Sequence, residues 1–418
     1  MSLSDSGLFQ LASVGSYLDA LSSITDGMSL RERSNLIHLD RCLHALWGLG
    51  ANVLLNWSPR DDGLELLVVP HYAIAGYACD EAGGNSGSEP FLRSLLSGPR
   101  RLDSAQLQKV ARLLQVEATF LPLQHPLSQN EAQQKIVERI IRRYGITYVP
   151  SRAVALFDIV GFGLLGPLAQ MTQLNSLSYS MNSAQSRLGS KRIGIDFARS
   201  TTGDGFYVWN TDLSLDANVN LFHFMHLVLA DNAIARSKAN GDIAPRLRAG
   251  FHVAGSYEFH QAEGLNPTLY HYIVGDVTVD LARMIERAEP DQILIGDFEA
   301  EMQFLDGSSR SWVMLDTIDF VGRAARNVEQ LRGLVLSGER VDLIKCYLTG
   351  AKLESGEYTV RRIQINDKHG KTRSVFNAKA NIYRRNSDPI LLGIQDTSLA
   401  PETRRKERSE HLLRADSA

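Results

Sequence analysis

The sequence predicts an α/β protein of the α+β kind with two or three domains, and three observations support this. The chain has 418 residues, whereas a single hydrophobic core rarely grows past about 250 residues. Runs typical of strands are interleaved with apolar stripes typical of amphipathic helices. Two aspartates, Asp158 and Asp204, stand in glycine-containing turns at the ends of strand-like runs. We therefore expect sheets covered by helices, with polar chemistry at the strand ends.

Composition and charge exclude several classes of partner. Hydrophobic residues make up 44% of the chain and charged residues 22%, as in ordinary soluble proteins. A net charge of −3 gives no reason to expect a nucleic acid or an anionic membrane as partner. The isolated cysteines Cys42, Cys79 and Cys346 predict neither a zinc site nor a disulfide framework. The N-terminus lacks the pattern of a signal peptide, and the most apolar stretches, 42–55 and 66–79, are too short to span a membrane. We expect a soluble, cytoplasmic protein.

Residues 1–127 predict an α/β domain with a sensor-like order of elements. Residues 30–55 hold an amphipathic helix that runs into a strand at Asn52–Trp57. The next predicted elements are a strand, a loop, a helix and a strand, at Leu64–Val69, Glu81–Gly87, Ser104–Leu114 and Thr119–Leu123. This order is loosely similar to that of GAF domains, and no residue in it identifies a ligand.

Residues 128–149 predict a connecting helix. Ser128 and Glu131 have the spacing of a capping box, and the helix runs through Arg143 with one apolar stripe, formed by Ile136, Val137, Ile140 and Ile141. The stripe fits either ordinary packing on a neighbouring domain or a signalling coiled coil.

Residues 150–320 hold the segments with recognisable chemistry, and residues 321–400 predict an extension. In the extension we expect a helix at Ala324–Leu336 and a hairpin that joins 358–365 to 374–384 through the turn at 366–370. The tail, 401–418, is strongly charged and is expected to be disordered.

Two carboxylates carry the predicted chemistry. An apolar strand delivers Asp158 to its exposed end, and the backbone amides of Ile159 to Phe162 follow in a glycine turn that could face phosphate oxygens. Asp204 lies in a second glycine-flanked turn that leads into an apolar strand. Carboxylates on adjacent strand ends can hold two hard divalent cations around a triphosphate. Either aspartate alone is more often a turn former or a helix cap.

Four segments in order resemble the catalytic domain of class III adenylate and guanylate cyclases. They are Phe-Asp-Ile-Val-Gly-Phe at 157–162, Gly-Asp-Gly-Phe at 203–206, Arg-Ala-Gly-Phe-His-Val-Ala-Gly at 248–255, and the stretch 272–295 with Gly-Asp-Val-Thr-Val-Asp-Leu-Ala-Arg. The last stretch is absent from the GGDEF diguanylate cyclases, which have a related fold. The resemblance implies a ferredoxin-like βαββαβ catalytic domain.

The resemblance also assigns roles to residues. Asp158 and Asp204 would bind two divalent cations, Mg²⁺ or Mn²⁺, with the carbonyl of Ile159 as an added ligand. Phe162 would lie at the nucleoside triphosphate substrate, and Arg283 would stabilise charge on the α-phosphate. In the family these groups come from two chains, which implies a homodimer with shared active sites.

The positions that read the base depart from the family pattern. Ser200 stands where adenine readers carry lysine and guanine readers glutamate, and Tyr272 stands where adenylate cyclases usually carry aspartate. The ribose-orienting asparagine is replaced by Val279 on direct counting, or by Asp280 after a one-residue shift. A lysine-glycine pair for the triphosphate tail is missing, and Arg310 or Arg323 could serve instead.

These departures favour a changed base. Tyrosine fills space and serine is a short donor and acceptor, so a pyrimidine read by Ser200 or the neighbouring Arg199 would fit. The chain is similar in this respect to the bacterial cyclases of Pycsar antiviral systems, which make cyclic UMP or cyclic CMP for a separate cyclic-nucleotide-binding effector. UTP is the first expected substrate and CTP the second. An adenylate or guanylate cyclase, a catalytically silent nucleotide sensor and a structural dimerisation module are the alternatives.

Overall fold

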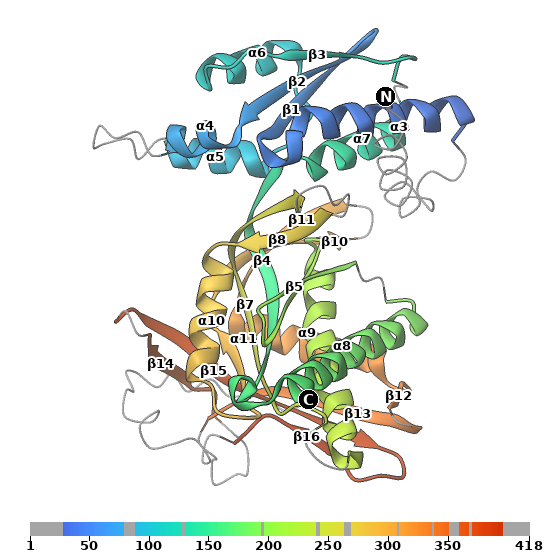
Figure 1. Cartoon of the computed structure of the whole chain (residues 1–418). Coiled ribbons are helices and arrows are strands. Elements are labelled where there is room, and N and C mark those ends of the chain that lie inside the picture. Colours follow the sequence, from blue (N-terminus) through green and yellow to red (C-terminus); the bar gives the residue numbers. More distant parts are fainter. Residues whose placement is uncertain are drawn as a thin grey trace. The chain divides into compact units, whose positions relative to one another are not determined.

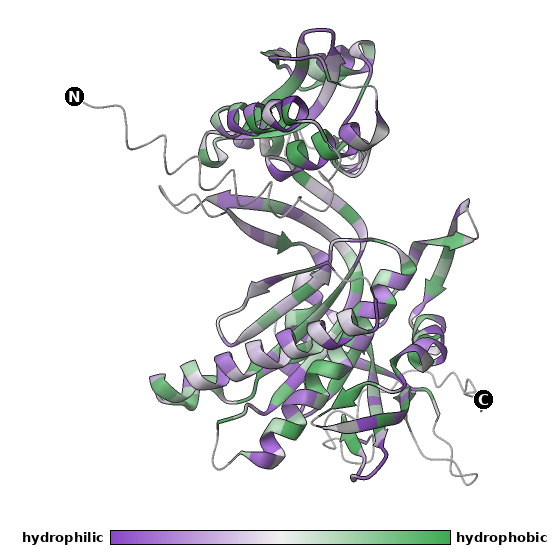
Figure 2. Cartoon of the chain, turned by 90° about the vertical axis from the view of Figure 1, so that its right-hand side faces the viewer, coloured by the Kyte–Doolittle hydropathy of each residue, from purple (hydrophilic) through white to green (hydrophobic). Residues whose placement is uncertain are grey.

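The computed structural model describes residues 28–78, 88–127, 130–193, 196–239, 243–262, 269–306, 309–336, 338–350, 359–367 and 370–395 (Figure 1). The chain divides into two compact units. The first comprises Met1–Pro150 and Tyr257–Ile273, and the second comprises Ser151–Ser256 and Val274–Ala418. Hydrophobic and hydrophilic residues alternate in bands along the helices and strands (Figure 2), as expected for elements that bury one face.

The first unit is a three-stranded antiparallel sheet with helices. Its order is α3 (Leu30–Trp47), β1 (Asn52–Arg60), β2 (Gly63–Pro70), α4 (His71–Ala78), α5 (Ser88–Ser97), α6 (Ser104–Leu113), β3 (Thr119–Pro122) and α7 (Glu131–Arg143), and the sheet order is β1-β2-β3. The predicted first helix and hairpin are confirmed as α3 and β1–β2. The helix predicted at 104–114 and the strand predicted at 119–123 are confirmed as α6 and β3. The predicted loop 81–87 and Ser128 of the predicted capping box lie outside the described residues.

Two hydrophobic clusters stabilise this unit. One joins α3 and α7 to the sheet and contains the whole predicted stripe of α7, including Ile136 and Ile140. The other joins the sheet to α4, α5 and α6. Helix α3 begins at a capping box, because the Ser29 side chain accepts from the Glu32 amide while the Glu32 carboxylate accepts from the Ser29 amide.

The second unit contains the predicted ferredoxin-like core. Its elements are β4 (Ile146–Ile159), α8 (Pro167–Ser190), β5 (Phe197–Thr201), β6 (Gly205–Asn210), α9 (Leu215–Lys238) and β7 (Leu247–Ala262). These form the order βαββαβ, and the strands lie as β7-β4-β6-β5. Both β4 and β5 pair with β6 in antiparallel register. The chain is therefore α+β with the predicted core topology.

The sheet continues beyond this core. The next elements are β8 (Leu269–Val274), α10 (Asp276–Arg287), β9 (Ile293–Gly296), β10 (Glu299–Asp306), β11 (Ser309–Asp316), α11 (Thr317–Asn327), β12 (Val335–Leu336), β13 (Glu339–Thr349), β14 (Arg362–Asn366), β15 (Thr372–Arg384) and β16 (Ile390–Leu392). β9 pairs with β7 in parallel and with β15 in antiparallel register. β10 and β11 form a separate two-stranded sheet. The residues after 320 thus extend the same sheet.

The helix predicted at Ala324–Leu336 is wrong in its bounds, while the hairpin after it is confirmed. Helix α11 begins after Asp316, whose side chain caps it, and ends at Asn327. Residues 335–336 are a short strand paired with β13. β14 and β15 pair from Arg362↔Phe376 to Asn366↔Thr372.

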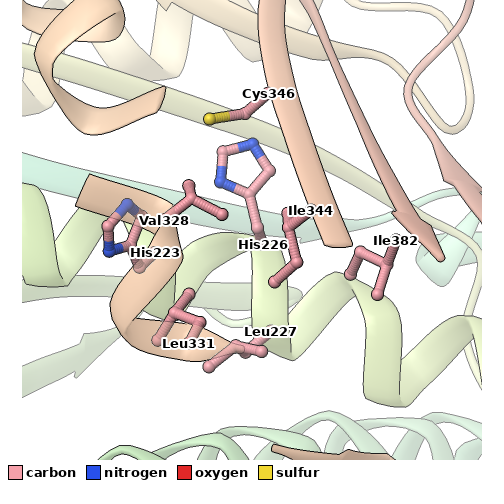
Figure 3. Close-up of a pocket in the computed structure, with 8 residues that line it drawn as sticks. All are labelled: His223, His226, Leu227, Val328, Leu331, Ile344, Cys346 and Ile382. Atoms are coloured by element: carbon pink, nitrogen blue, oxygen red, sulfur yellow. The ribbon is translucent and has the colours of Figure 1, made fainter. Parts of the chain in front are cut away.

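Helix α9 lies in the core of the second unit, and most of its side chains are buried. An apolar sequence on nearly all sides of a helix is typical of this position. A small cavity beside α9 is lined by His223, His226, Cys346 and apolar side chains (Figure 3). Among the described residues, no helix is long and apolar enough to cross a bilayer.

Candidate active site

Asp158 is the last polar residue of β4, next to the turn that begins at Val160. β4 is buried on both faces from Arg152 to Ile159, which explains the apolar run before the acid. Asp158 itself is only 8% exposed, so the expected exposed carboxylate is wrong. Its partner across the sheet is Gly205 on β6.

Asp204 lies in the turn between β5 and β6, and backbone contacts hold this turn against the end of β4. The amide of Ile159 donates to the carbonyl of Asp204 at 3.0 Å. Gly203 has a φ of +97°, which favours glycine. A Cβ on Gly205 would lie 1.9 Å from the carbonyl oxygen of Phe157, so only glycine fits there. The two glycines around Asp204 therefore serve backbone geometry and bring both acids to one edge.

Arg248 on β7 is a site residue that the sequence did not single out. Its Nε and Nη2 donate to Oδ2 of Asp158 at 2.8 and 2.5 Å. Burial is the largest influence on Asp158 and raises the pKa of its carboxyl, Arg248 opposes this, and the nearby charge of Asp204 adds to it. Arg248 is the first residue of the segment 248–255 that carries the family resemblance. A single arginine in a strand does not indicate in the sequence that it contacts Asp158.

The donor set fits hard divalent cations. The Asp158 and Asp204 carboxylates and the Ile159 carbonyl supply oxygen ligands, which Mg²⁺ and Mn²⁺ prefer. Within the described part of the chain, no group of three or more His, Cys, Asp or Glu side chains could hold a metal ion. Ions at this carboxylate pair would therefore need oxygens from the substrate to complete their coordination.

The backbone amides after Asp158 are only partly available for phosphate. The amide of Ile159 donates to Asp204, and that of Val160 donates to the carbonyl of Arg246 at 2.9 Å. The expectation that all four amides face phosphate is therefore wrong for these two. Gly161 and Phe162 remain in the turn, and the Phe162 side chain packs partly buried against the core.

Ser200 and Arg199 lie on opposite faces of β5. Ser200 pairs directly with Tyr207 of β6, and the hydroxyl of Tyr207 donates to the carbonyl of Thr278 on α10 at 3.0 Å. Arg199 points to α8, where it donates to Ser178 and Asn182 at 3.4 Å. Because neighbouring strand residues face opposite ways, Ser200 and Arg199 do not contribute to one surface.

Tyr272 belongs to the part of β8 in the first unit, where its ring stacks on Phe259 with centroids 5.8 Å apart. It is 36% exposed. The structure thus brings Asp158, Asp204 and Arg248 together in the second unit and places Tyr272 in the first.

Helix α10 carries the remaining predicted residues. Arg283 donates to the Glu286 carboxylate at 2.7 Å, and Val279 is exposed. Asp280 accepts from Arg373 of β15 at 2.6 Å and lies 3.6 Å from Nε2 of His252.

The two arginines considered for the triphosphate tail lie elsewhere in the second unit. Arg310 is exposed on β11, and the guanidinium of Arg323 on α11 lies over the ring of Phe304.

No family model matches the chain, and no curated protein matches it. Similar solved structures include the guanylate cyclase domain of RhGC from Catenaria anguillulae in complex with GTP, at 14% identity and TM-score 0.28 over 41% of this chain and 98% of that chain. The adenylyl cyclase CyaB from P. aeruginosa has 12% identity and TM-score 0.30 over 58% of this chain and 97% of that chain. The guanylyl cyclase Cya2 has 13% identity and TM-score 0.26 over 40% and 91%. Identities and TM-scores this low leave the function to be inferred from the chain's own residues.

Proposed function

We propose that the protein is a nucleotide cyclase that converts a nucleoside triphosphate into a 3′,5′-cyclic nucleotide and pyrophosphate. The observation that carries this proposal is the pair Asp158 and Asp204, fixed at adjoining strand ends of a ferredoxin-like sheet by the Ile159–Asp204 backbone hydrogen bond. The four family-like segments lie on β4, the β5–β6 turn, β7 and β8–α10, and all but the start of the last belong to the second unit, which supports the same assignment.

The residues around the pair divide the chemistry between them. A pair of divalent cations, when bound, would supply Lewis acidity at the ribose 3′-hydroxyl and charge neutralisation at the leaving pyrophosphate. Asp158, Asp204 and the Ile159 carbonyl would hold these ions. Arg248 neutralises Asp158 in this structure, and its guanidinium would turn to phosphate oxygens once the carboxylate takes a cation.

The reaction closes a ring on the α-phosphate. The 3′ oxygen forms a bond to the α-phosphorus as the bond to pyrophosphate breaks, and the hydroxyl proton leaves to water. Arg283 would stabilise negative charge on the α-phosphate. In the family-like homodimer, Arg283 of one chain would act on the nucleotide held by the aspartates of the other.

We assign the base to the pyrimidines, with UTP before CTP. Ser200 pairs with Tyr207 of β6, whose hydroxyl contacts α10, and Ser200 stands where the adenine readers of the family carry lysine. Each unmet polar group on a purine edge would cost about 1–3 kcal/mol. A cyclic pyrimidine nucleotide read by a separate effector in bacterial antiviral defence, as in Pycsar systems, is the role that fits this substrate.

The purified protein should be incubated with Mn²⁺ or Mg²⁺ and each of the four nucleoside triphosphates, with pyrophosphate and cyclic product measured. We expect the highest kcat/KM with UTP. Asp158→Ala and Asp204→Ala should each abolish turnover. Asp342→Ala, which removes an exposed carboxylate paired with Arg385, should leave it unchanged.

The other outcomes separate the alternatives. Best turnover with ATP or GTP would remove the pyrimidine assignment and leave the cyclase. Nucleotide binding without pyrophosphate release would favour the silent sensor. Activity above a tenth of wild type in either aspartate variant would overturn the metal assignment.

If each active site is shared between two chains, mixing two inactive variants should restore part of the activity. An equal mixture of Asp158→Ala and Arg283→Ala chains should recover up to about a quarter of wild-type activity, because half the dimers are mixed and each has one intact site. No rescue, with mixed dimers demonstrated, would place Arg283 at the nucleotide of its own chain.

A further inference from the structure

Arg373 on β15 lies between two carboxylates that come from different elements. Its Nε donates to Oδ1 of Asp280 on α10 at 2.6 Å, and its Nη1 donates to Asp367 in the turn between β14 and β15. The Arg373 side chain is only 9% exposed. A guanidinium shared in this way, with limited access to water, is a stronger link than a surface ion pair.

Asp280 is held from a second direction by His252 of β7, whose Nε2 lies 3.6 Å from Oδ2. Burial opposes ionisation of Asp280, but the hydrogen bonds from His252 and Arg373 outweigh it and leave the pKa of this carboxyl below its ordinary value. Burial likewise acts against the charge of Arg373, and the two carboxylates outweigh it and raise its pKa. Asp280 is thus engaged inside the chain and is a poor candidate for orienting a ribose.

The hairpin turn meets α10 at a second point. Nε of Arg287 donates to the carbonyl of Asn366 at 2.9 Å. The turn itself is closed by Asp367, which accepts from the amide of Lys371 at 2.9 Å. The same Asp367 therefore shapes the turn and receives Arg373, so the Arg373 guanidinium joins the turn to the helix beside the Arg287 contact.

Asp280 and Arg283 stand three residues apart on α10, a spacing that places two side chains on neighbouring positions of one helix face. We propose that Arg373 is a positioning residue for Arg283: it fastens α10 to the turn of the β14–β15 hairpin and so sets where the Arg283 guanidinium meets the nucleotide. This inference rests on the proposed cyclase function. It gives the C-terminal hairpin a role in catalysis.

The first test compares Arg373→Met, Arg373→Lys and Asp280→Asn by steady-state kinetics with UTP. We expect kcat to fall by about 10- to 100-fold in Arg373→Met with KM changed less than about twofold, because only the position of a group acting in the transition state is lost. Arg373→Lys should recover part of kcat, since lysine keeps the charge but not the fork. Asp280→Asn keeps the Arg373–Asp367 pair and should also lower kcat.

The matched control is Arg362→Met. Arg362 lies on β14 in the same hairpin and pairs with Asp297, which follows β9, at 2.9 Å. It should retain wild-type kinetics. A loss of kcat equal to that of Arg373→Met would mean that the hairpin matters only for general stability and would overturn the proposal.

Mixed dimers give a readout that a structural role would not produce. The Arg373→Met chain keeps its aspartates and loses a well-placed Arg283, so it should be rescued by Asp158→Ala chains and not by Arg283→Ala chains. Rescue by Arg283→Ala chains alone would overturn the proposal. If the control mixture of Asp158→Ala and Arg283→Ala shows no rescue, the shared site fails instead.

Hydrogen exchange tests the fastening without turnover. We expect faster exchange in Arg373→Met at α10 and around the turn that begins at Asn366, and unchanged exchange in α9. Unchanged exchange in α10 would overturn the fastening. Faster exchange in α10 together with no turnover of any nucleotide by the wild-type protein would leave the fastening in place and remove the proposed function.

Discussion

The two halves of the candidate site are fixed by different kinds of contact. At the end of the sheet, the Asp204 turn is held by main-chain contacts, with the Ile159 amide bonded to the Asp204 carbonyl and Gly205 pressed on Phe157. Helix α10 is held by side chains, through Arg373 and Asp280, which are 93 residues apart in the chain. Main-chain contacts tolerate few side-chain changes at the turn, whereas a helix held by side chains can be released by a single substitution.

This difference has a consequence for how each half can vary. The backbone of the Asp204 turn depends mainly on its two glycines, Gly203 and Gly205. A change on the distant hairpin moves Arg283 without touching the carboxylates. We therefore expect substitutions that displace the Asp158 and Asp204 edge to abolish activity. Substitutions that remove single contacts of α10 should lower activity only in part.

Gly205→Ala is the change with the largest expected effect. A Cβ would lie 1.9 Å from the Phe157 carbonyl oxygen and 3.1 Å from Cα of Asp158, so β4 and β6 must separate. Forced overpacking of this kind costs about 1–3 kcal/mol or more, and displacement of Asp158 should abolish turnover. Urea denaturation and the four-nucleotide assay measure both effects.

Gly203→Ala is the matched control for this variant. Its Cβ would meet no atom within 4 Å, and only the φ of +97° would be strained, at a cost of about 1 kcal/mol. Equal losses in the two variants would show that turn conformation, and not close approach to β4, fixes Asp204.

The same contrast explains what the sequence could predict. The sheet edge with the two acids is encoded locally, by an apolar run, an acid and adjacent glycines, so the sequence placed Asp158 and Asp204 on the correct elements, while their role as metal ligands stays a prediction. The burial of Asp158 could not be predicted, because its partner Arg248 comes from a strand 90 residues away. The link from Asp280 to Arg373 is equally distant and has no local pattern.

The secondary-structure predictions were likewise accurate where the signal in the sequence was local. Elements with strong local signals, such as α3 with its amphipathic pattern and the β14–β15 hairpin, were predicted close to their observed bounds. The segment 324–336 was not, because Leu331, Leu334 and Leu336 continue an apolar pattern but are buried from a 3₁₀ helix at Val328–Leu331, the link after it and a short strand. Tertiary packing buries such residues without a helix, and periodicity alone does not distinguish the two cases.

His226→Leu tests a residue that belongs neither to the sheet edge nor to α10. It should make the stability of the fold less sensitive to acid. His226 points from α9 toward Cys346 (Figure 3), and its Nε2 has no hydrogen-bond partner among the described residues. Burial lowers the pKa of His226 to about 4, whereas an unfolded histidine titrates near 6.5. Because the folded pKa is depressed, the stability is present above about pH 6.5 and is lost as the pH falls toward 4.

The expected result is that the variant loses about 2 kcal/mol less stability than wild type between pH 7 and pH 5. Leucine has a similar size and removes the unpartnered Nε2 but also loses the Nδ1 contact with the Phe222 carbonyl at 2.8 Å, so stability at pH 7 should fall by about 1 kcal/mol. Chemical denaturation at both pH values measures this. The neighbouring His223, whose pKa burial also lowers to about 4, should keep part of the acid sensitivity in the variant. An unchanged slope between pH 7 and 5 would exclude His226 as its source.

Tyr207→Phe is the smallest expected effect and tests another contact of α10. The Tyr207 hydroxyl donates to the Thr278 carbonyl at 3.0 Å, and burial raises the pKa of the phenol to about 12, so it stays a donor at neutral pH. Loss of one neutral hydrogen bond should cost about 1 kcal/mol of stability and lower kcat by less than Arg373→Met does, because no charged pair is broken. Tyr179→Phe, at an exposed position of α8, is the control and should match wild type.

If Tyr207 and Arg373 hold the same helix, the double variant should lose less kcat than the product of the two single losses, since a helix already released at one end gains little freedom from the second change. Strictly multiplicative losses would mean that the two contacts act independently, and α10 would not be the unit that positions Arg283.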